Sequence, residues 1–492
     1  MIEQKQLLDQ LPKEIKPAFQ ELKVLKHLNA AVSKRSLALP VRICFASFSF
    51  CCFARRTSFE SFKGETFPGK DTVYRFLNHS GYAWRRFLLS LSSETVRRVR
   101  KLTSAHRETV FIFDDSMFER NRSKAVEMLA RFKDHATGAY YKGFRMLTMG
   151  WSDGHSFIPM DFALLSSTKS GITGMMEGID KRSAGYKRRL EAFFSAPQVI
   201  AAMLDRAIQS GVSASFVLMD SWFTHAPLIQ EVMRRGLYVI GMVKNDNKRY
   251  IVGGQRICLK ALYAVAPRVE GKNRNILRLI RTDQAPGIPV TVVFVRHRSM
   301  KNEWLAILST DLTLSAQEII RIYRIRWEIE VFFKCAKSLL RLQKEFQGRS
   351  YDLLVSHTTI VFSRYILLAW QHRQSTNQRF FGGLFYLLCD EVDTLDWAVA
   401  LQQLVEVMNE IVTQVGKKLS AMIKSQLQHW ISALPSYIKD YLPISCWSSR
   451  REPRSSRPSQ IRTSDCLTIM KIDDLCRNST SKEMSVYALY RR

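Results

Sequence analysis

Residues 315–343 read SAQEIIRIYRIRWEIEVFFKCAKSLLRLQ and set the interpretation of the whole chain. Ser315 and Glu318 have capping-box spacing, and no Pro or Gly follows, which predicts one long helix. At about 100° per residue, apolar side chains share one arc: Ile322, Ile325, Ile329, Phe332, Ala336, Leu339 and Leu340. Four polar side chains share another arc: Tyr323, Arg326, Glu330 and Lys337. This polar stripe is either a solvated face stabilised by charge pairs or a carboxylate held among phosphate-binding groups.

The overall charge indicates a polyanionic partner. The 492 residues include 74 Lys and Arg against 44 Asp and Glu, a net charge of +30. The excess is spread along the chain, which favours a long DNA path over a single basic tail. An ordinary apolar content of 46% indicates a globular protein with ample core.

The chain shows no pattern of a secreted or membrane protein. Its nine cysteines have no CxxC or zinc-finger spacing, which is typical of reduced cysteines in the cytosol. The N-terminus does not resemble a signal peptide. Residues 37–54 are apolar but contain Pro40 and Arg42, so we interpret them as a buried helix and expect no membrane partner. We expect a cytoplasmic protein that associates with the nucleoid when bound to DNA.

Changes in composition along the chain predict its domains. Residues 1–108 form a helical domain whose basic and aromatic side chains favour DNA binding, the alternative being a solvated basic face. Residues 109–375 alternate strands and helices, which indicates an α/β core with a mixed sheet. Residues 250–303 form a β-strand insertion within that core. Residues 376–446 form a C-terminal helical region suited to dimerisation, and the basic tail at 447–492 is predicted to be disordered.

Two apolar strands end in aspartate. TVFIFDDS (109–116) places Asp115 at a strand end, and SFVLMD (215–220) places Asp220 at another. One such aspartate alone is commonly a turn or a helix cap. Two in one sheet can share an edge, and a helix that crosses the edge can add Glu330. Three carboxylates with open coordination positions suit Mg²⁺ or Mn²⁺ held against phosphate, so we predict these three as catalytic and metal-binding residues.

The polar stripe also matches a known signature. Tyr323, Arg326, Glu330 and Lys337 have the spacing Y-x2-R-x3-E-x6-K, which resembles the YREK motif of bacterial cut-and-paste transposases of insertion sequence family four. FDDS resembles the first-aspartate motif of the family, in which the aspartate before Ser or Thr is the ligand, hence Asp115. The resemblance covers residues 109–345 and implies a DDE triad on an RNase H-like fold.

The resemblance implies a reaction and its partners. The family binds the terminal inverted repeats of its element, cleaves each end through a DNA hairpin and joins the 3′ ends to target DNA, with two Mg²⁺ ions that Mn²⁺ can replace. Tyr323, Arg326 and Lys337 would contact DNA. Trp304 matches the tryptophan that receives a flipped base, its alternative role being core packing. A homodimer would hold the two ends together.

Two other functions remain open. One is a catalytically silent DNA-binding regulator or a decayed transposase copy. The composition after Trp447 differs from that of the preceding helices, which is the reason to consider this alternative. The other is a metal-dependent nuclease that cuts DNA without joining it. The intact carboxylates and YREK residues argue against decay.

Overall fold

The computed structural model describes residues 15–32, 44–45, 69–104, 106–133, 138–269, 275–297, 300, 303–344 and 348–374, together with Ile423, Ser425, Gln426 and His429. The chain divides into two compact units, one of residues 1–385 with 480–492 and one of residues 386–479. Every element below belongs to the first unit. Apart from those four residues, the predicted C-terminal helical region and tail lie outside the described residues.

One mixed sheet organises the first unit. Its described strands are β1 (Val110–Glu119), β2 (Ala130–Lys133), β3 (Tyr140–Ser152), β4 (Phe157–Leu165), β5 (Phe216–Met219), β6 (Tyr238–Val243), β7 (Arg249–Val252), β8 (Gln255–Cys258), β9 (Ile276–Gln284), β10 (Ile288–Arg296) and β11 (Trp304–Ser309). They lie in the order β2-β3-β1-β5-β6-β11-β10-β9-β7-β8, and β4 pairs with β3. Strands β1, β5 and β6 are parallel, whereas β3 and β11 flank them antiparallel. This arrangement is the predicted RNase H-like mixed sheet.

Burial explains why these segments form the sheet centre. The first five residues of β1, all four of β5 and all nine of β4 are buried. Continuous apolar runs of this kind are typical of strands covered on both faces. Asp153-Gly154 forms the hairpin turn between β3 and β4, with Ser152 opposite Phe157 and Gly154 at a φ of 77°. A positive φ is readily adopted only by glycine, so the Asp-Gly pair suits this connection.

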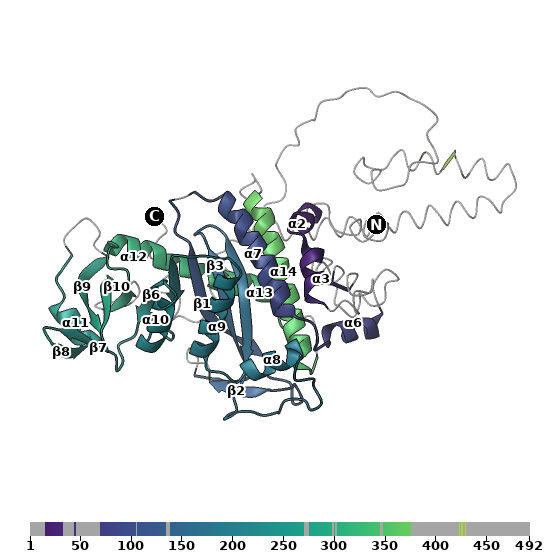
Figure 1. The fold of residues 1–492 in the computed structure, drawn as a ribbon, viewed down its shortest axis with the longest axis horizontal. Coiled ribbons are helices and arrows are strands. Elements are labelled where there is room, and N and C mark those ends of the chain that lie inside the picture. Colours follow the sequence, from purple (N-terminus) through teal and green to yellow (C-terminus); the bar gives the residue numbers. More distant parts are fainter. Residues whose placement is uncertain are drawn as a thin grey trace, which may run out of the picture. The chain divides into compact units, whose positions relative to one another are not determined.

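Helices pack around the sheet and on one another. Those described are α2 (Lys16–Glu21), α3 (Val24–Ala31), α6 (Lys70–Leu77), α7 (Trp84–Lys101), α8 (Ala184–Glu191), α9 (Ala196–Gln209), α10 (Ala226–Met233), α11 (Leu259–Val265), α12 (Ala316–Tyr323), α13 (Trp327–Ser338) and α14 (Tyr351–Gln374). Helix α12 packs on β6 and β11, α13 on β1 and β4, and α14 on α7 and β4 (Figure 1). Helix α14 is long and apolar enough to cross a membrane, but its apolar segment is wholly buried in the protein.

Helix α7, which the sequence assigns to a separate DNA-binding domain, packs on the sheet. It contacts β4 and α14, so it forms part of the same compact unit. Its Arg85 binds Asp161 of β4 at 3.0 Å and also pairs with Glu191. Arg206 of α9 binds the other oxygen of Asp161 at 2.9 Å. Part of the basic pattern predicted as a DNA surface therefore stabilises the core instead.

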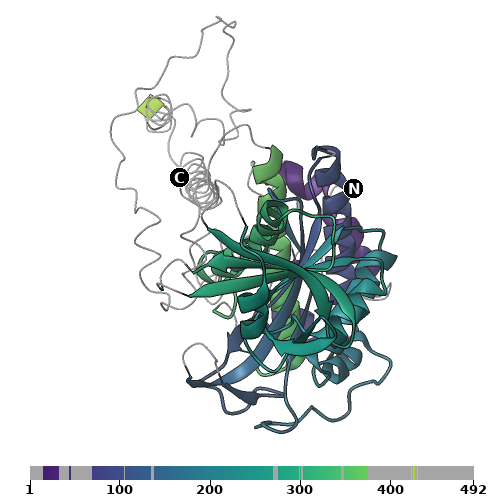
Figure 2. The ribbon, with the colours of Figure 1, turned by 90° about the vertical axis from the view of Figure 1, so that its left-hand side faces the viewer.

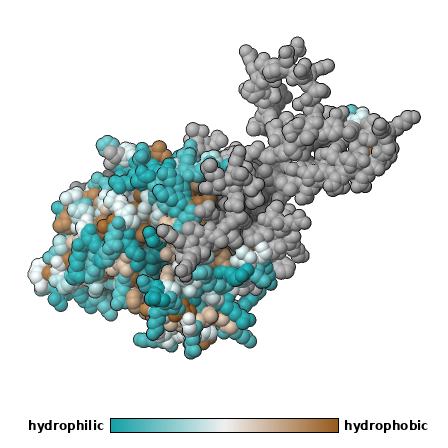
Figure 3. Space-filling view, turned by 45° about the vertical axis from the view of Figure 1, so that its right-hand side comes forward, coloured by the Kyte–Doolittle hydropathy of each residue, from teal (hydrophilic) through white to brown (hydrophobic). Residues whose placement is uncertain are grey.

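The predicted insertion extends the sheet rather than forming a separate layer. Strand β10 pairs with β11, which returns the chain to β6. Figure 2 shows these strands continuing the twist of the sheet. Over the visible surface of the described part, hydrophilic residues predominate and hydrophobic ones are scattered (Figure 3).

The single helix predicted over residues 315–343 is wrong in one respect. The capping box of Ser315 and Glu318 is present, but α12 ends at Tyr323. A 3₁₀ turn, η2 (Arg324–Arg326), then precedes α13, which ends at Ser338. A 3₁₀ turn has 3.0 residues per turn instead of 3.6, so three such residues rotate the following helix by roughly 60°. Arg326, the last residue of this turn, donates to Asp114 of β1, a contact that helical periodicity cannot reveal.

Candidate active site

The two predicted aspartate segments lie side by side, although only Asp220 follows a strand end. Strand β1 continues past Asp114 and Asp115 to Glu119, because these residues keep pairing with β3 after the pairing with β5 stops. In the parallel pair of β1 and β5, Phe113 is opposite Met219, so the next residues, Asp114 and Asp220, meet at the carboxyl end of the sheet. Asp220 turns its Oδ1 toward its own loop, where it accepts the backbone N–H groups of Trp222 at 2.9 Å and Phe223 at 3.2 Å. This edge of the sheet therefore gathers negative charge.

The neighbouring aspartates of β1 point in different directions. Side chains alternate along a strand, so Asp114 shares a face with Ser116, and Asp115 lies on the other face. Arg326 donates to Asp114 at 2.8 Å. Asp115 instead pairs with Arg145 of β3, whose Nε lies 2.6 Å from Oδ2. The sequence predicts Asp115 as the first ligand; the register sets Asp114 level with Asp220, and the charge of Asp115 also acts on Asp220.

The polar stripe of the helix faces this edge. Arg326 also lies 3.2 Å from Glu330, and Lys337 donates to the Ser116 hydroxyl at 2.6 Å. The stripe is therefore not the freely solvated face that one interpretation of the sequence offered. Helix α13 holds Glu330 over the strand face that carries Asp114.

Burial and mutual repulsion shape the electrostatics of the site. Burial raises the pKa of Asp114 well above its usual range, and the nearby carboxylates of Glu330, Asp220 and Asp115 raise it further, against Arg326. Burial also raises the pKa of Asp220. These groups carry an unfavourable concentration of negative charge, which a cation would relieve.

The same surroundings shift the pKa values of the other three residues of the stripe. Burial opposes the charged form of Arg326, but Tyr323 and the carboxylates of Asp114 and Glu330 outweigh it and raise the pKa of Arg326. Burial lowers the pKa of Lys337. Burial raises the pKa of the Tyr323 phenol to about 12, which keeps it neutral and able to donate a hydrogen bond.

The donor set fits a divalent cation by its chemistry, because carboxylate oxygens are hard ligands. In the described ranges, however, no three Asp, Glu, His or Cys side chains are grouped as a ready-made metal site. Arg326 engages Asp114 and Glu330, and Arg145 engages Asp115. A cation bound here would take the place of part of this arginine pairing.

Trp304, the predicted base-receiving residue, lies on the other face of the sheet. Leu305 and Ile307 of β11 line a cavity beside Tyr323, so alternation turns Trp304 away from that side. Its ring stacks on Tyr263 of α11, with centroids 4.8 Å apart and planes at 13°. It also meets Phe294 edge-on at 5.0 Å. The structure does not bring Trp304 together with the other predicted site residues.

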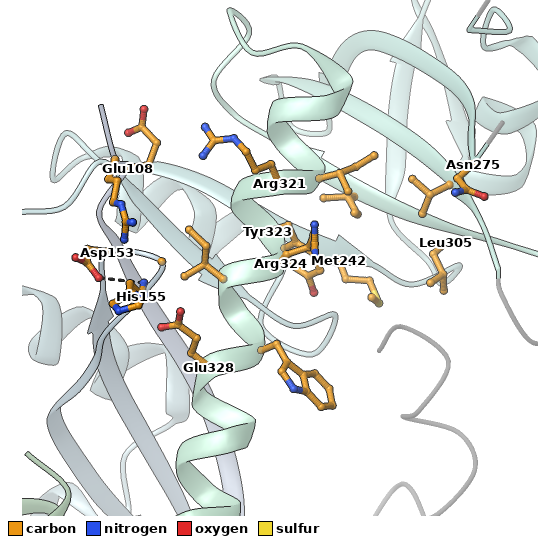
Figure 4. Close-up of a pocket in the computed structure, with 17 residues that line it drawn as sticks. Glu108, Asp153, His155, Met242, Asn275, Leu305, Arg321, Tyr323, Arg324 and Glu328 are labelled. Atoms are coloured by element: carbon orange, nitrogen blue, oxygen red, sulfur yellow. Dashed lines mark hydrogen bonds between the residues drawn. The ribbon is translucent and has the colours of Figure 1, made fainter. Parts of the chain in front are cut away.

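The cavity beside Tyr323 measures about 570 Å³ and lies between helices α12 and α13 and the β3–β4 hairpin. Glu328 points from α13 toward the turn that contains Asp153 and His155 (Figure 4). Its carboxyl accepts the Ser152 hydroxyl at 2.5 Å, and burial raises its pKa to about 7. Glu328 thus secures the back of α13 to the hairpin while Glu330 faces the acidic edge.

Arg145 and Lys244 were absent from the sequence-based prediction, and the sequence left Trp222 open between core packing and a wedge in a DNA hairpin. Arg145 carries no local signal, because its place depends on the β1–β3 register that sets it opposite Met117. Trp222 has a partial signal, since it follows Asp220 by two residues. Its ring lies 5.8 Å from the Arg145 guanidinium and 5.7 Å from the Lys244 ammonium.

Carboxylates of adjacent parallel strands thus lie beneath a helix with a further glutamate, on an RNase H-like sheet. Residues 45–292, half of the chain, match the family model described as DDE superfamily endonuclease. The chain belongs to this family of DDE superfamily endonucleases. Asp114, Asp115 and Asp220 fall within the matched segment, and the YREK residues follow it.

One solved structure shows a more distant similarity. A cryo-EM structure of the piggyBac transposase synaptic complex with hairpin DNA has 10% sequence identity and a TM-score of 0.42, and the match covers 90% of this chain and 84% of that chain. This similarity is too low to support an argument about the present protein. No curated protein sequence matches the chain.

Proposed function

We propose that this protein is a cut-and-paste transposase of the YREK type, similar to insertion sequence family four. It binds the terminal inverted repeats of its element, cleaves them and joins the 3′ ends to target DNA. One observation carries the proposal: Arg326 binds both Asp114 and Glu330 beside Asp220, so the signature residues and the strand-end acids form one site.

The acidic residues of the site bind the metal ions. Asp220 and Glu330 act with a first carboxylate from the pair Asp114–Asp115; the resemblance assigns Asp115, whereas the strand register favours Asp114. These carboxylates hold divalent cations, Mg²⁺ or its substitute Mn²⁺, two ions in the full site. Such ions supply charge neutralisation at the phosphate and lower the pKa of an attacking hydroxyl group.

The basic side chains position the DNA. The Arg326 guanidinium can move from a carboxylate to a phosphate, because its planar fork matches either group. Lys337 provides a second cation at the end of the stripe, and the neutral Tyr323 phenol can donate to a phosphate oxygen. Cleavage through a DNA hairpin and the action of a homodimer on two ends are parts of the same proposal.

The main alternative is a catalytically silent DNA-binding regulator or a decayed copy. The acids and YREK residues are all retained and lie together, which supports an active enzyme. Cytoplasmic localisation with association to the nucleoid is consistent with a substrate of double-stranded DNA and belongs to the proposal.

A cleavage and joining assay tests the function. Purified protein is incubated with Mg²⁺, supercoiled plasmid and a labelled duplex that carries the inverted repeat flanking its gene. Joined product supports transposition, cleavage alone indicates a nuclease, and binding alone indicates a regulator. Glu330→Gln should abolish cleavage. Glu318→Gln is the matched control, because Gln preserves the capping box at the start of α12.

A further inference from the structure

The turn that follows β5 controls the direction of the Asp220 carboxylate. Asp220 Oδ1 accepts the backbone N–H groups of Trp222 at 2.9 Å and Phe223 at 3.2 Å. The Thr224 hydroxyl donates to the Asp220 carbonyl oxygen at 2.7 Å. Because Oδ1 is held by its own turn, the position of the turn determines where Oδ2 lies. Groups that hold the turn therefore orient a proposed metal ligand.

The inner side of this turn is fixed by close packing on β6. Phe223 and Thr224 are both buried. A Cβ atom added to Gly241 of β6 would lie 2.2 Å from the Thr224 hydroxyl oxygen, a clash that only glycine avoids. The turn therefore has no room to move inward, and its position depends on what holds it from outside.

The outer side of the turn carries Trp222, whose ring is occupied by two cations. The Arg145 guanidinium lies 5.8 Å and the Lys244 ammonium 5.7 Å from the ring centroid, within the range of cation–π attraction. Arg145 belongs to β3 and Lys244 follows β6, so the cations come from the two strands that flank the β1–β5 pair. Trp222 keeps 44% of its surface exposed, so burial alone does not hold this side chain.

Asp115 completes this arrangement through Arg145. The Arg145 Nε donates to Asp115 Oδ2 at 2.6 Å, and about a quarter of each side chain is exposed, 27% and 25%. A chain of contacts therefore runs from Asp115 of β1 through Arg145 to the Trp222 ring and the Asp220 turn. These contacts give Asp115 a structural role that does not require it to bind a metal ion.

We propose that Arg145, Trp222 and Lys244 are positioning residues, which hold the Asp220 turn in the conformation that binds a divalent cation. Asp115 acts through Arg145, and Asp114 supplies the first carboxylate ligand. The planar guanidinium can bind Asp115 and contact the indole at the same time, which a lysine ammonium does less well. This inference rests on the proposed function, because it concerns the metal site of that function.

Manganese binding in the absence of DNA tests the positioning role. Electron paramagnetic resonance of free Mn²⁺ gives its affinity for the full chain. Trp222→Ala changes no charge, so we expect roughly 10-fold weaker Mn²⁺ binding through loss of position alone. Trp222→Phe should retain most of the affinity, because an aromatic face remains for the two cations. Tyr238→Ala is the matched control. It removes a similarly exposed aromatic residue (46%) of β6 and should leave the affinity unchanged.

A double-mutant cycle tests whether Arg145 and Trp222 act together. Arg145→Lys conserves the charge but loses the planar fork, so it should also weaken Mn²⁺ binding. In the Trp222→Ala background it should add little, because both substitutions break the same contact. Additive losses would overturn the joint role. Asp115→Asn should still bind Mn²⁺, whereas Asp114→Asn should not. The reverse result would make Asp115 the ligand and would also overturn the proposal.

The outcomes distinguish this inference from the proposed function. If wild type binds Mn²⁺ but neither cleaves nor joins DNA, the proposed function fails, and the affinities of the variants still decide the positioning role. If Trp222→Ala binds Mn²⁺ as tightly as wild type, the positioning role fails, whereas cleavage and joining by wild type would still support the function. Absence of Mn²⁺ binding by wild type would contradict both.

Discussion

The Arg326 guanidinium donates to the Asp114 carboxylate at 2.8 Å and thereby ties the start of α13 to the middle of β1. Both side chains are largely buried, with 15% and 10% of their surfaces exposed. The same guanidinium lies 3.2 Å from Glu330. One arginine thus keeps acids of two distant segments apart and in place.

Arg326→Ala should therefore destabilise the protein as well as inactivate it. Removal of the cation leaves buried acids without a partner, which costs about 3 kcal/mol of unfolding free energy. Urea denaturation measures the change. Arg324→Ala, two residues earlier in η2, serves as the control and should cost less. Equal losses for the two variants would contradict a special role for Arg326.

Single substitutions decide which aspartate of β1 belongs to the catalytic set. Asp114 shares the strand face of Ser116 beneath α13, whereas Asp115 binds Arg145. We expect Asp114→Asn to reduce strand cleavage by roughly 100-fold or more, because an essential metal ligand contributes several kcal/mol to the transition state. Asp115→Asn should retain more activity. The reverse order, measured with one labelled duplex, would support the assignment from the sequence resemblance.

Lys337 should contribute to DNA binding through its charge. Its ammonium is partly buried against Ser116, at the end of the stripe opposite Tyr323. Lys337→Met should weaken binding and reduce the slope of log affinity against log salt by about 1, as expected for one lost phosphate contact. Lys334→Met on the exposed side of the same helix is the matched control. An unchanged salt slope in Lys337→Met would exclude a direct phosphate contact.

The ionic cluster around Asp161 should be essential for folding. Asp161 is 1% exposed and binds Arg85 and Arg206. Asp161→Asn leaves these guanidinium groups without their counter-charge and should cost about 3–5 kcal/mol of unfolding free energy. Asp205→Asn is the matched control. The Asp205 side chain is 47% exposed where it pairs with Arg235, so the cost should stay below about 1 kcal/mol.

The same cluster predicts an acid-dependent loss of stability. Although burial opposes ionisation, Arg85, Arg206 and Arg188 lower the pKa of Asp161 to about 2. The unfolded chain protonates this group near pH 3.9, so its contribution is complete above that pH and is lost as the pH falls toward 2. The difference in unfolding free energy between wild type and Asp161→Asn should therefore narrow over this interval. A constant difference would show that the carboxylate is not the responsible group.

Much of the fold follows from local patterns. The apolar runs before Asp114 and Asp220, the Asp153-Gly154 turn and the Ser315 cap depend on neighbours within a few residues, so the sequence alone predicts them. The spacing of Tyr323, Arg326, Glu330 and Lys337 likewise identifies the polar stripe. These are effects of backbone propensity and of helical or strand periodicity.

Other features depend on contacts between distant segments. The β1–β5 register brings the Asp114–Asp115 pair to Asp220, with Asp114 level with it, and alternation along β11 turns Trp304 toward Tyr263. The 3₁₀ turn in the helix and the pairing of Arg145 have no local signal. A shift of one residue in strand register moves every side chain to the opposite face. The chain thus encodes locally which groups could carry the chemistry, whereas strand pairing selects those that meet at the acidic edge.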